Sequence, residues 1–327
     1  MLRRTLGHSG ISVARIGLGT ATWGLGTSED DCGAQLTDYV DAGGNLVDTA
    51  NIYGGGRSEE ILGRLLRGTV PREDIVLCTK AVLTGEKPPF GTDASAATLL
   101  AELTKSLNRL GLDHVDVWQM HIWDDHTPLD DTLDAIQQAI SSGRARTAGL
   151  CNYTGWQTAK AATTQDKLGR PQLSSVQVEY SLLQRGIERE VLPAARHFGL
   201  GILPWAPLGR GVLTGKYRNG VPAERADSRF FQWYVRGLAE SKRAAAVVEE
   251  VATAAEQLGV PPLGVALSWV RDREGVVAPL VGARTAEQLR ESLAVAELDL
   301  PPEIRTRLDQ VSEPHLGYPE RAWSNAG

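Results

Sequence analysis

The chain has 327 residues, of which 42% are apolar and 23% are charged, with a formal net charge of −6 and an isoelectric point near 5.6. The acidic balance argues against a nucleic-acid-binding protein, which would carry clustered basic charge, and no apolar run approaches the roughly 18 residues that a membrane span needs. No apolar segment follows the two N-terminal arginines, as a signal peptide would require. The cysteines Cys32, Cys78 and Cys151 lack metal-ligand spacing and are typical of free thiols in a reducing cytosol, so we expect a cytoplasmic protein.

The first residues mix polar side chains with isolated apolar ones, and the turn residues Gly7-His8-Ser9-Gly10 predict a small hairpin. Segments with the helical spacing of apolar residues follow at 34–40, 59–66, 99–110, 133–140 and 191–198. Short apolar runs separate them, near residues 15–19, 45–47, 75–79, 115–119, 147–151, 174–178, 201–204 and 277–281. Eight such runs, mostly about 30 residues apart and alternating with helices, predict parallel strands with right-handed crossovers, and eight is the number that closes a barrel.

One connection is irregular. The segment from Gly209 to Trp233 is too long for an ordinary barrel connection, and loops of that length tend to be functional lids or binding segments. A helix is expected near 241–258 and a C-terminal tail from about Pro301. Because no composition break marks a second domain, the sequence predicts an α/β fold made of a single (β/α)8 TIM barrel over residues 1–327. It has an N-terminal hairpin, a long loop after strand seven and a C-terminal tail.

Polar residues stand at the ends of three successive predicted strands. Asp48 follows the second apolar run, Lys80 the third and His121 the fourth, and Tyr53 lies in the loop after Asp48. Active sites of (β/α)8 barrels lie at the C-terminal ends of the strands, so we expect these four side chains to converge. Ser58-Glu59-Glu60, just beyond the loop, reads as the start of a helix.

Tyr53 is the candidate proton donor of this group. A free tyrosine titrates near 10 and is a poor acid at neutral pH, but a lysine ammonium about 4 Å away stabilises the phenolate by roughly 4 kcal/mol at an effective dielectric of 20. That is expected to lower the pKa of Tyr53 by as much as about three units before desolvation acts. Asp48 would keep Lys80 protonated and in place, and a neutral His121 would hydrogen-bond a substrate carbonyl oxygen. The set has no redox centre, so the carbonyl carbon needs hydride from a cofactor, which indicates a nicotinamide.

These residues belong to motifs spread along the whole chain, in order and at suitable spacing, and with them the chain resembles the aldo-keto reductases. The motifs are Gly17-Leu18-Gly19-Thr20 with Thr22-Trp23, Asp48-Thr49-Ala50-Asn51-Ile52-Tyr53-Gly54, Lys80, His121, Gly149-Leu150-Cys151-Asn152, Gln177 with Glu179-Tyr180-Ser181, Trp205-Ala206-Pro207-Leu208-Gly209, and Gly282-Ala283-Arg284-Thr285 with Gln288 and Glu291. The resemblance implies reduction of an aldehyde or ketone by NAD(P)H, with Tyr53 as general acid and Asp48, Lys80 and His121 as its catalytic partners.

The resemblance also implies a cofactor site. Asn152 and Gln177 would hold the carboxamide, Trp205 would stack on the nicotinamide, and residues 208–216 would run along the pyrophosphate. The expected cofactor residues are Thr22, Trp23, Asp48, Asn152, Gln177, Trp205, Ala206, Pro207, Leu208, Gly209, Gly211, Lys216, Gly282, Arg284, Gln288 and Glu291. A guanidinium at Arg284 suits a 2′-phosphate, which favours NADP(H), with NAD(H) as the alternative. The chain departs from the family pattern at Cys151, where serine is common, and at Ser292, where asparagine is usual.

A small-molecule carbonyl compound is the expected partner. Trp23 and Trp123 lie just past strand ends and are expected to line its pocket with Tyr53 and His121. No metal is expected, because the acidic and histidine residues at 121–126 lack the spacing of the helical zinc motif. Two other functions stay open, a cofactor-binding regulatory subunit with weak catalysis and an enoyl or keto reductase of sugar nucleotides. No motif specifies the natural substrate or the oligomeric state.

Overall fold

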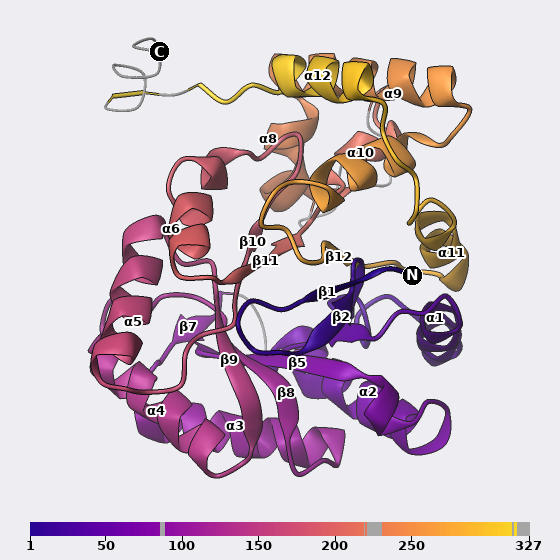
Figure 1. The fold of residues 1–327 in the computed structure, drawn as a ribbon. Helices are drawn as coiled ribbons and strands as arrows, with labels where there is room; N and C mark the ends of the chain where they lie inside the picture. Colours follow the sequence, from indigo (N-terminus) through magenta and orange to yellow (C-terminus); the bar gives the residue numbers. More distant parts are fainter. Residues whose placement is uncertain (86–88, 219, 221–230, 316, 319–327) are drawn as a thin grey trace.

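A computed structural model of the chain forms eight parallel strands into one sheet, with helices around it (Figure 1). The structure describes residues 1–85, 89–218, 220, 231–315, 317 and 318. In chain order the strands of this sheet are β3 (Gly17–Gly19), β4 (Leu46–Asp48), β5 (Val76–Ala81), β8 (Val115–Met120), β9 (Ala145–Cys151), β10 (Ser175–Glu179), β11 (Gly201–Trp205) and β12 (Leu280–Val281). Each predicted apolar run overlaps one of them.

The sheet closes on itself. Its spatial order is β12-β3-β4-β5-β8-β9-β10-β11, so neighbours in the chain are neighbours in the sheet. At the seam, the amide of Ile202 donates to Gly275 O at 3.0 Å, and Val277 N donates to Ile202 O at 2.8 Å. These bonds join β11 to the segment before β12, and the prediction of a (β/α)8 barrel is confirmed.

Helices connect the strands and form the outer layer. They are α1 (Glu29–Asp41), α2 (Arg57–Gly68), α3 (Ala96–Leu110), α4 (Leu129–Ser141), α5 (Gly155–Lys167), α6 (Val191–His197), α8 (Arg236–Ala239), α9 (Lys242–Leu258), α10 (Pro262–Arg271), α11 (Ala286–Ala294) and α12 (Pro302–Val311). Short helical turns are η1 (Tyr53–Gly56), η2 (Arg72–Asp74), η3 (Gly186–Glu188), η4 (Gly209–Thr214) and η5 (Phe231–Val235). The predicted long loop after strand seven thus begins in η4 and ends in η5, and its residues 219 and 221–230 lie outside the described part.

The predicted helix start at Ser58-Glu59-Glu60 is confirmed, since α2 begins at Arg57, directly after Gly56, which has a φ of 96°. Ser58 is wholly buried in the first turn. The expected C-terminal tail starts as helix α12, directly after Pro301. Proline is well suited to the first helical position because its missing N–H needs no partner there. In Figure 1 this helix lies beside α9.

The predicted N-terminal hairpin, β1 (Arg3–Thr5) with β2 (Ser12–Ala14), is confirmed as an antiparallel pair, and a second small hairpin joins β6 (Leu83–Thr84) to β7 (Gly91–Thr92). Leu6, Ile11 and Val13 of the N-terminal segment pack with the apolar side chains inside the barrel. They cover the N-terminal ends of the strands, because Leu6 contacts Gly201 at the start of β11. The opposite end carries the polar residues. Within the described residues, no helix has the length and apolar character to cross a membrane.

Candidate active site

A buried ion pair occupies the C-terminal ends of β4 and β5. Lys80 Nζ lies 2.5 Å from Asp48 Oδ2 and 2.8 Å from the carbonyl oxygen of Thr49. Gln177 Nε2 donates to the other oxygen of Asp48, Oδ1, at 2.8 Å. Burial alone would lower the pKa of Lys80, but the attraction and hydrogen bond of the Asp48 carboxylate, together with smaller contributions from Tyr53 and Cys151, raise that pKa above its usual value. Lys80 is therefore a fixed, buried ammonium ion.

Tyr53, in η1, completes this group. Lys80 Nζ donates to its hydroxyl oxygen at 3.2 Å, which leaves the phenol hydrogen to be directed elsewhere. Burial raises the pKa of Tyr53, and so does Asp48, while Lys80 lowers it by less than burial raises it. The expectation that Lys80 brings the pKa below that of a free tyrosine was therefore wrong for the protein without ligands, because desolvation outweighs the attraction of the ammonium. Tyr53 is a neutral phenol at neutral pH.

His121 follows β8 and faces the tyrosine. Its main-chain amide donates to Ala81 O at 2.9 Å, and its ring lies edge-on to the Tyr53 ring, with centroids 6.0 Å apart. Burial, with a smaller contribution from Lys80, holds the pKa of His121 well below its usual value. The imidazole is therefore neutral and can donate a hydrogen bond to an oxygen above Tyr53 without adding a charge.

This buried imidazole gives a prediction about acid stability. Below about pH 6.5 an unfolded histidine takes up a proton, whereas folded His121 does not until the pH reaches its lower pKa. Stability is thus lost as the pH falls, by up to about 1.4 kcal/mol per pH unit from this one residue. Urea unfolding between pH 7 and pH 5 should show a shallower loss in His121→Asn than in the wild type. The same loss of unfolding free energy between pH 7 and pH 5 in the two proteins would contradict the prediction.

The ends of β9, β10 and β11 carry the side chains expected at the nicotinamide. Asn152 Nδ2 donates to His121 O at 3.0 Å, and Asn152 Oδ1 accepts from Trp205 Nε1 at 2.9 Å. Cys151 Sγ lies 3.7 Å from Gln177 Oε1. Asn152 has a φ of 57°, a conformation that asparagine tolerates better than most residues. The structure thus brings these residues next to the Asp48 and His121 side chains.

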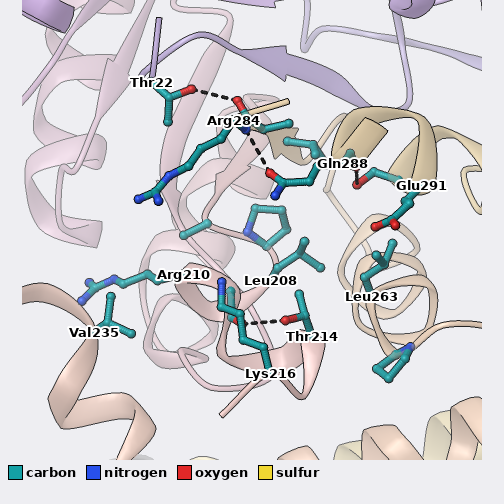
Figure 2. A pocket seen from close by; sticks show the side chains of 18 of the residues that line it. Thr22, Leu208, Arg210, Thr214, Lys216, Val235, Leu263, Arg284, Gln288 and Glu291 are labelled. Carbon is teal, nitrogen blue, oxygen red and sulfur yellow. Dashed lines mark hydrogen bonds between the residues drawn. The ribbon is translucent and has the colours of Figure 1, made fainter. Parts of the chain in front are cut away.

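A cavity of 670 Å³ lies between the η4 segment and the β12–α11 connection, within the size range of cofactor sites. In Figure 2, Lys216 points its amine into this space, and Arg284, Gln288 and Glu291 lie on the other side. The predicted cofactor residues on its walls are Thr22, Ala206, Pro207, Leu208, Gly211, Lys216, Gly282, Arg284, Gln288 and Glu291. Arg210 and Thr214, from the stretch 208–216 that was expected along the pyrophosphate, also line it. Lining residues that the sequence analysis did not assign include Tyr217, Phe231, Val235, Pro261, Pro262 and Leu263. The Pro-Pro pair and the η5 residues belong to no motif, so only the fold reveals them.

Arg210 links the long segment to the strand ends. It adopts a φ of 59°, and its Nη2 donates to Glu179 Oε2 at 2.7 Å. Its guanidinium carbon lies 3.6 Å from the centre of the Tyr234 ring, whose plane is within 11° of that of Trp205. Arg210 therefore joins η4, η5 and β10 beside the expected nicotinamide position.

Two residues lie elsewhere than expected. Trp23 is wholly buried, and its indole donates to Gln35 Oε1 at 3.0 Å, so it packs in the core and does not line the cavity. Gly209 is also buried, beneath Leu183, and lies off the walls of the cavity. In both cases the small loop around the residue turns it toward the protein interior.

Trp123 is half-buried at the barrel mouth. Its ring is 5.4 Å from that of Tyr153 and 5.3 Å from that of Trp156. Trp156, which the sequence analysis did not single out, is 57% exposed. No motif in the sequence around Trp156 indicates that exposure.

Comparison with known proteins agrees with this geometry. The sequence model of the Aldo/keto reductase family matches residues 15–313. The chain belongs to the aldo/keto reductase family.

Among aldo/keto reductases and other oxidoreductases, the chain is 35% identical over 315 residues to the uncharacterized oxidoreductase YrpG of Bacillus subtilis (strain 168), a match that covers 94% of both chains. It is 34% identical over 322 residues to L-glyceraldehyde 3-phosphate reductase of Escherichia coli O157:H7, covering 95% of this chain and 92% of the relative. The chain is therefore an oxidoreductase of the aldo/keto reductase type.

Proposed function

We propose that the protein reduces an aldehyde or ketone to an alcohol with NADPH, and that Tyr53 is the general acid. The observation that carries this proposal is the hydrogen bond of 3.2 Å from Lys80 Nζ to Tyr53 Oη, with Asp48 fixing the ammonium and a neutral His121 alongside. A proton donor and a hydrogen-bond donor then face the same point at the barrel mouth. A carbonyl oxygen placed at that point would receive a proton from Tyr53 and accept a hydrogen bond from His121.

The raised pKa of Tyr53 is compatible with this role. Hydride addition turns the carbonyl oxygen into an alkoxide, which is a far stronger base than a phenolate, so a neutral phenol protonates it readily. Lys80 stabilises the phenolate as it forms, because it is an ammonium held at hydrogen-bond distance in a site of low dielectric. Asp48 keeps Lys80 charged throughout. His121 orients the oxygen and remains neutral.

The residues present fit a nicotinamide dinucleotide. Lys216, Arg210 and Arg284 are among the residues that line the cavity, and such cations suit a pyrophosphate and a 2′-phosphate. Gly211 permits this arrangement, since a Cβ there would lie 2.4 Å from Lys216 Nζ. When bound, the nicotinamide would supply the hydride to the carbonyl carbon. Trp205, Asn152 and Gln177 would hold its ring.

Arg284 should set the preference for NADPH. Losing a charge-assisted hydrogen bond to the 2′-phosphate costs about 1.5–3 kcal/mol, so Arg284→Ala should raise the Kd of NADPH at least about tenfold. The Kd of NADH should change by less than about twofold, because NADH lacks that phosphate. Fluorescence titration of both cofactors measures this. The control is Arg290→Ala, since Arg290 is on the neighbouring helix α11 but pairs with Asp38. An equal rise in the Kd of NADPH and the Kd of NADH in Arg284→Ala would contradict the assignment of Arg284 to the 2′-phosphate.

A panel of carbonyl substrates tests the proposal as a whole. NADPH oxidation should be followed with aliphatic, aryl and phosphorylated aldehydes, with keto sugars and with keto and enoyl sugar nucleotides. The phosphorylated aldehydes are included because of the name of the Escherichia coli relative. Turnover on at least one class is expected. Tight NADPH binding without turnover on any of them would favour a regulatory subunit, and turnover confined to sugar nucleotides would favour the third alternative.

A further inference from the structure

The turn that carries Tyr53 has little conformational preference of its own. The next three residues, Gly54, Gly55 and Gly56, have φ values of 61°, 66° and 96°. Glycine adopts this left-handed region without steric cost, but it also leaves the chain flexible. On its N-terminal side Tyr53 is held by its own amide, which donates to Ala50 O at 3.1 Å. On the C-terminal side the glycines fix nothing themselves, so the turn is held there by the start of α2.

Ser58, in the first turn of α2, is tied to two strand ends. Its hydroxyl donates to Thr20 Oγ1 at 2.7 Å and lies 3.0 Å from Thr49 Oγ1. Thr20 Oγ1 in turn donates to the main-chain oxygen of Asp48 at 3.0 Å. All three hydroxyl residues are wholly buried, so no water competes for these bonds. The chain of hydroxyl groups joins α2 to the residue that holds Lys80.

Glu59 ties the same helix to a third strand. Its Oε1 accepts from Thr79 Oγ1 at 2.5 Å, and Thr79 directly precedes Lys80. Its Oε2 accepts from Arg109 Nε at 2.7 Å. The glycine turn rests on this arginine, because a Cβ on Gly56 would lie 2.8 Å from Arg109 Cδ. Glu59 has no exposed surface, and a buried carboxylate with two donors holds its partners firmly.

We propose that Ser58 and Glu59 are positioning residues for the proton donor, which hold the Tyr53 turn against the strand ends so that its hydroxyl stays in reach of Lys80. The inference rests on the proposed function of Tyr53. Neither side chain touches the reacting atoms. They act by fixing α2, on the far side of the turn, to the strands that carry Asp48 and Lys80.

The test replaces Glu59 and compares it with its neighbour. Glu59→Gln keeps the shape but places an amide where two donors meet, whereas Glu60→Gln changes an exposed glutamate on the same turn. Small misplacement of a catalytic group can cost up to about 100-fold, so we expect kcat of Glu59→Gln to fall about 10-fold to 100-fold, with the Kd of NADPH unchanged. Glu60→Gln should match the wild type.

A pH profile separates positioning from a general loss of stability. Reduction needs protonated Tyr53, so kcat falls as the pH rises through the pKa of Tyr53. Burial raises that pKa by more than Lys80 lowers it, so a turn that withdraws from the strand ends brings the pKa of Tyr53 down toward that of a free tyrosine. The alkaline limb of kcat in Glu59→Gln should therefore move to lower pH, which mere partial unfolding would not cause.

Should Glu59→Gln fail to fold, Thr79→Val provides the second variant. It removes only the bond from Thr79 to Glu59 and leaves Arg109 paired. Thr79→Val should show the same loss of kcat and the same shift of the alkaline limb, and Thr79→Ser should restore both. Wild-type kcat and an unshifted limb in a folded Glu59→Gln and in Thr79→Val would overturn the inference, even with the proposed function intact. A wild type that reduces no carbonyl on the panel would overturn the proposed function itself.

Discussion

Tyr53→Phe should lose at least about 100-fold in kcat for carbonyl reduction, which is the contribution expected of a general acid. The substitution removes one oxygen and leaves the ring to pack edge-on against His121. NADPH should bind with unchanged Kd, because the proposed role of Tyr53 is to protonate the substrate oxygen and Tyr53 is not among the residues expected to hold the cofactor. Steady-state kinetics with NADPH, together with a fluorescence titration, measures both quantities.

The matched control is Tyr318→Phe, which makes the same chemical change at a tyrosine that is 83% exposed. It should retain wild-type kcat. Turnover within a few-fold of the wild type in Tyr53→Phe would remove the proton donor from the proposed mechanism. His121 would then be the remaining candidate near the substrate oxygen.

Lys80→Met should cost about 3–5 kcal/mol of stability, because it leaves the Asp48 carboxylate buried without its cation. Lys80 is wholly buried, and among the described residues only Gln177 would still donate to the side-chain carboxylate of Asp48. Urea unfolding of the two proteins at neutral pH measures the difference. Carbonyl reduction should be lost as well, since nothing would then stabilise the phenolate of Tyr53.

Two further variants separate the charge effect from packing. Lys105→Met alters an exposed lysine that pairs with Glu102, and such surface pairs are worth at most about 1 kcal/mol. The double variant Asp48→Asn with Lys80→Met removes both charges and should recover part of the lost stability, because no unpaired charge stays buried. Additive losses in the double variant would contradict this account.

Much of the fold was predictable from the sequence because strands and helices alternate along the barrel at nearly regular spacing. Each strand is a short apolar run buried on both faces, such as Val76–Ala81, whose residues are all buried. Helix α5 was harder to find, because its buried positions are alanine, threonine and glutamine rather than large apolar residues. Helix α10 is almost entirely buried, so it shows no amphipathic spacing.

The candidate site was predictable where a chemically reactive side chain stands at the end of a predicted strand. Asp48 and Lys80 sit at strand ends, and the topology of a parallel barrel brings strand ends together. How deeply each of these side chains is buried could not be predicted. Trp23 also follows a strand, yet its loop folds it into the core. The raised pKa of Tyr53 was missed for the same reason, since desolvation depends on the packing around the whole loop.

The N-terminal hairpin, which covers one end of the barrel, has a consequence for how Tyr53 is reprotonated. Leu6, Ile11 and Val13 form an apolar floor, and Lys80 has no contact with solvent. In the proposed mechanism Tyr53 gives its proton to the substrate oxygen, and the apolar floor allows no proton to be resupplied from that end of the barrel. Replenishment must come through the same opening by which the alcohol departs, so each cycle ends only when the product has left and water has returned to the phenolate.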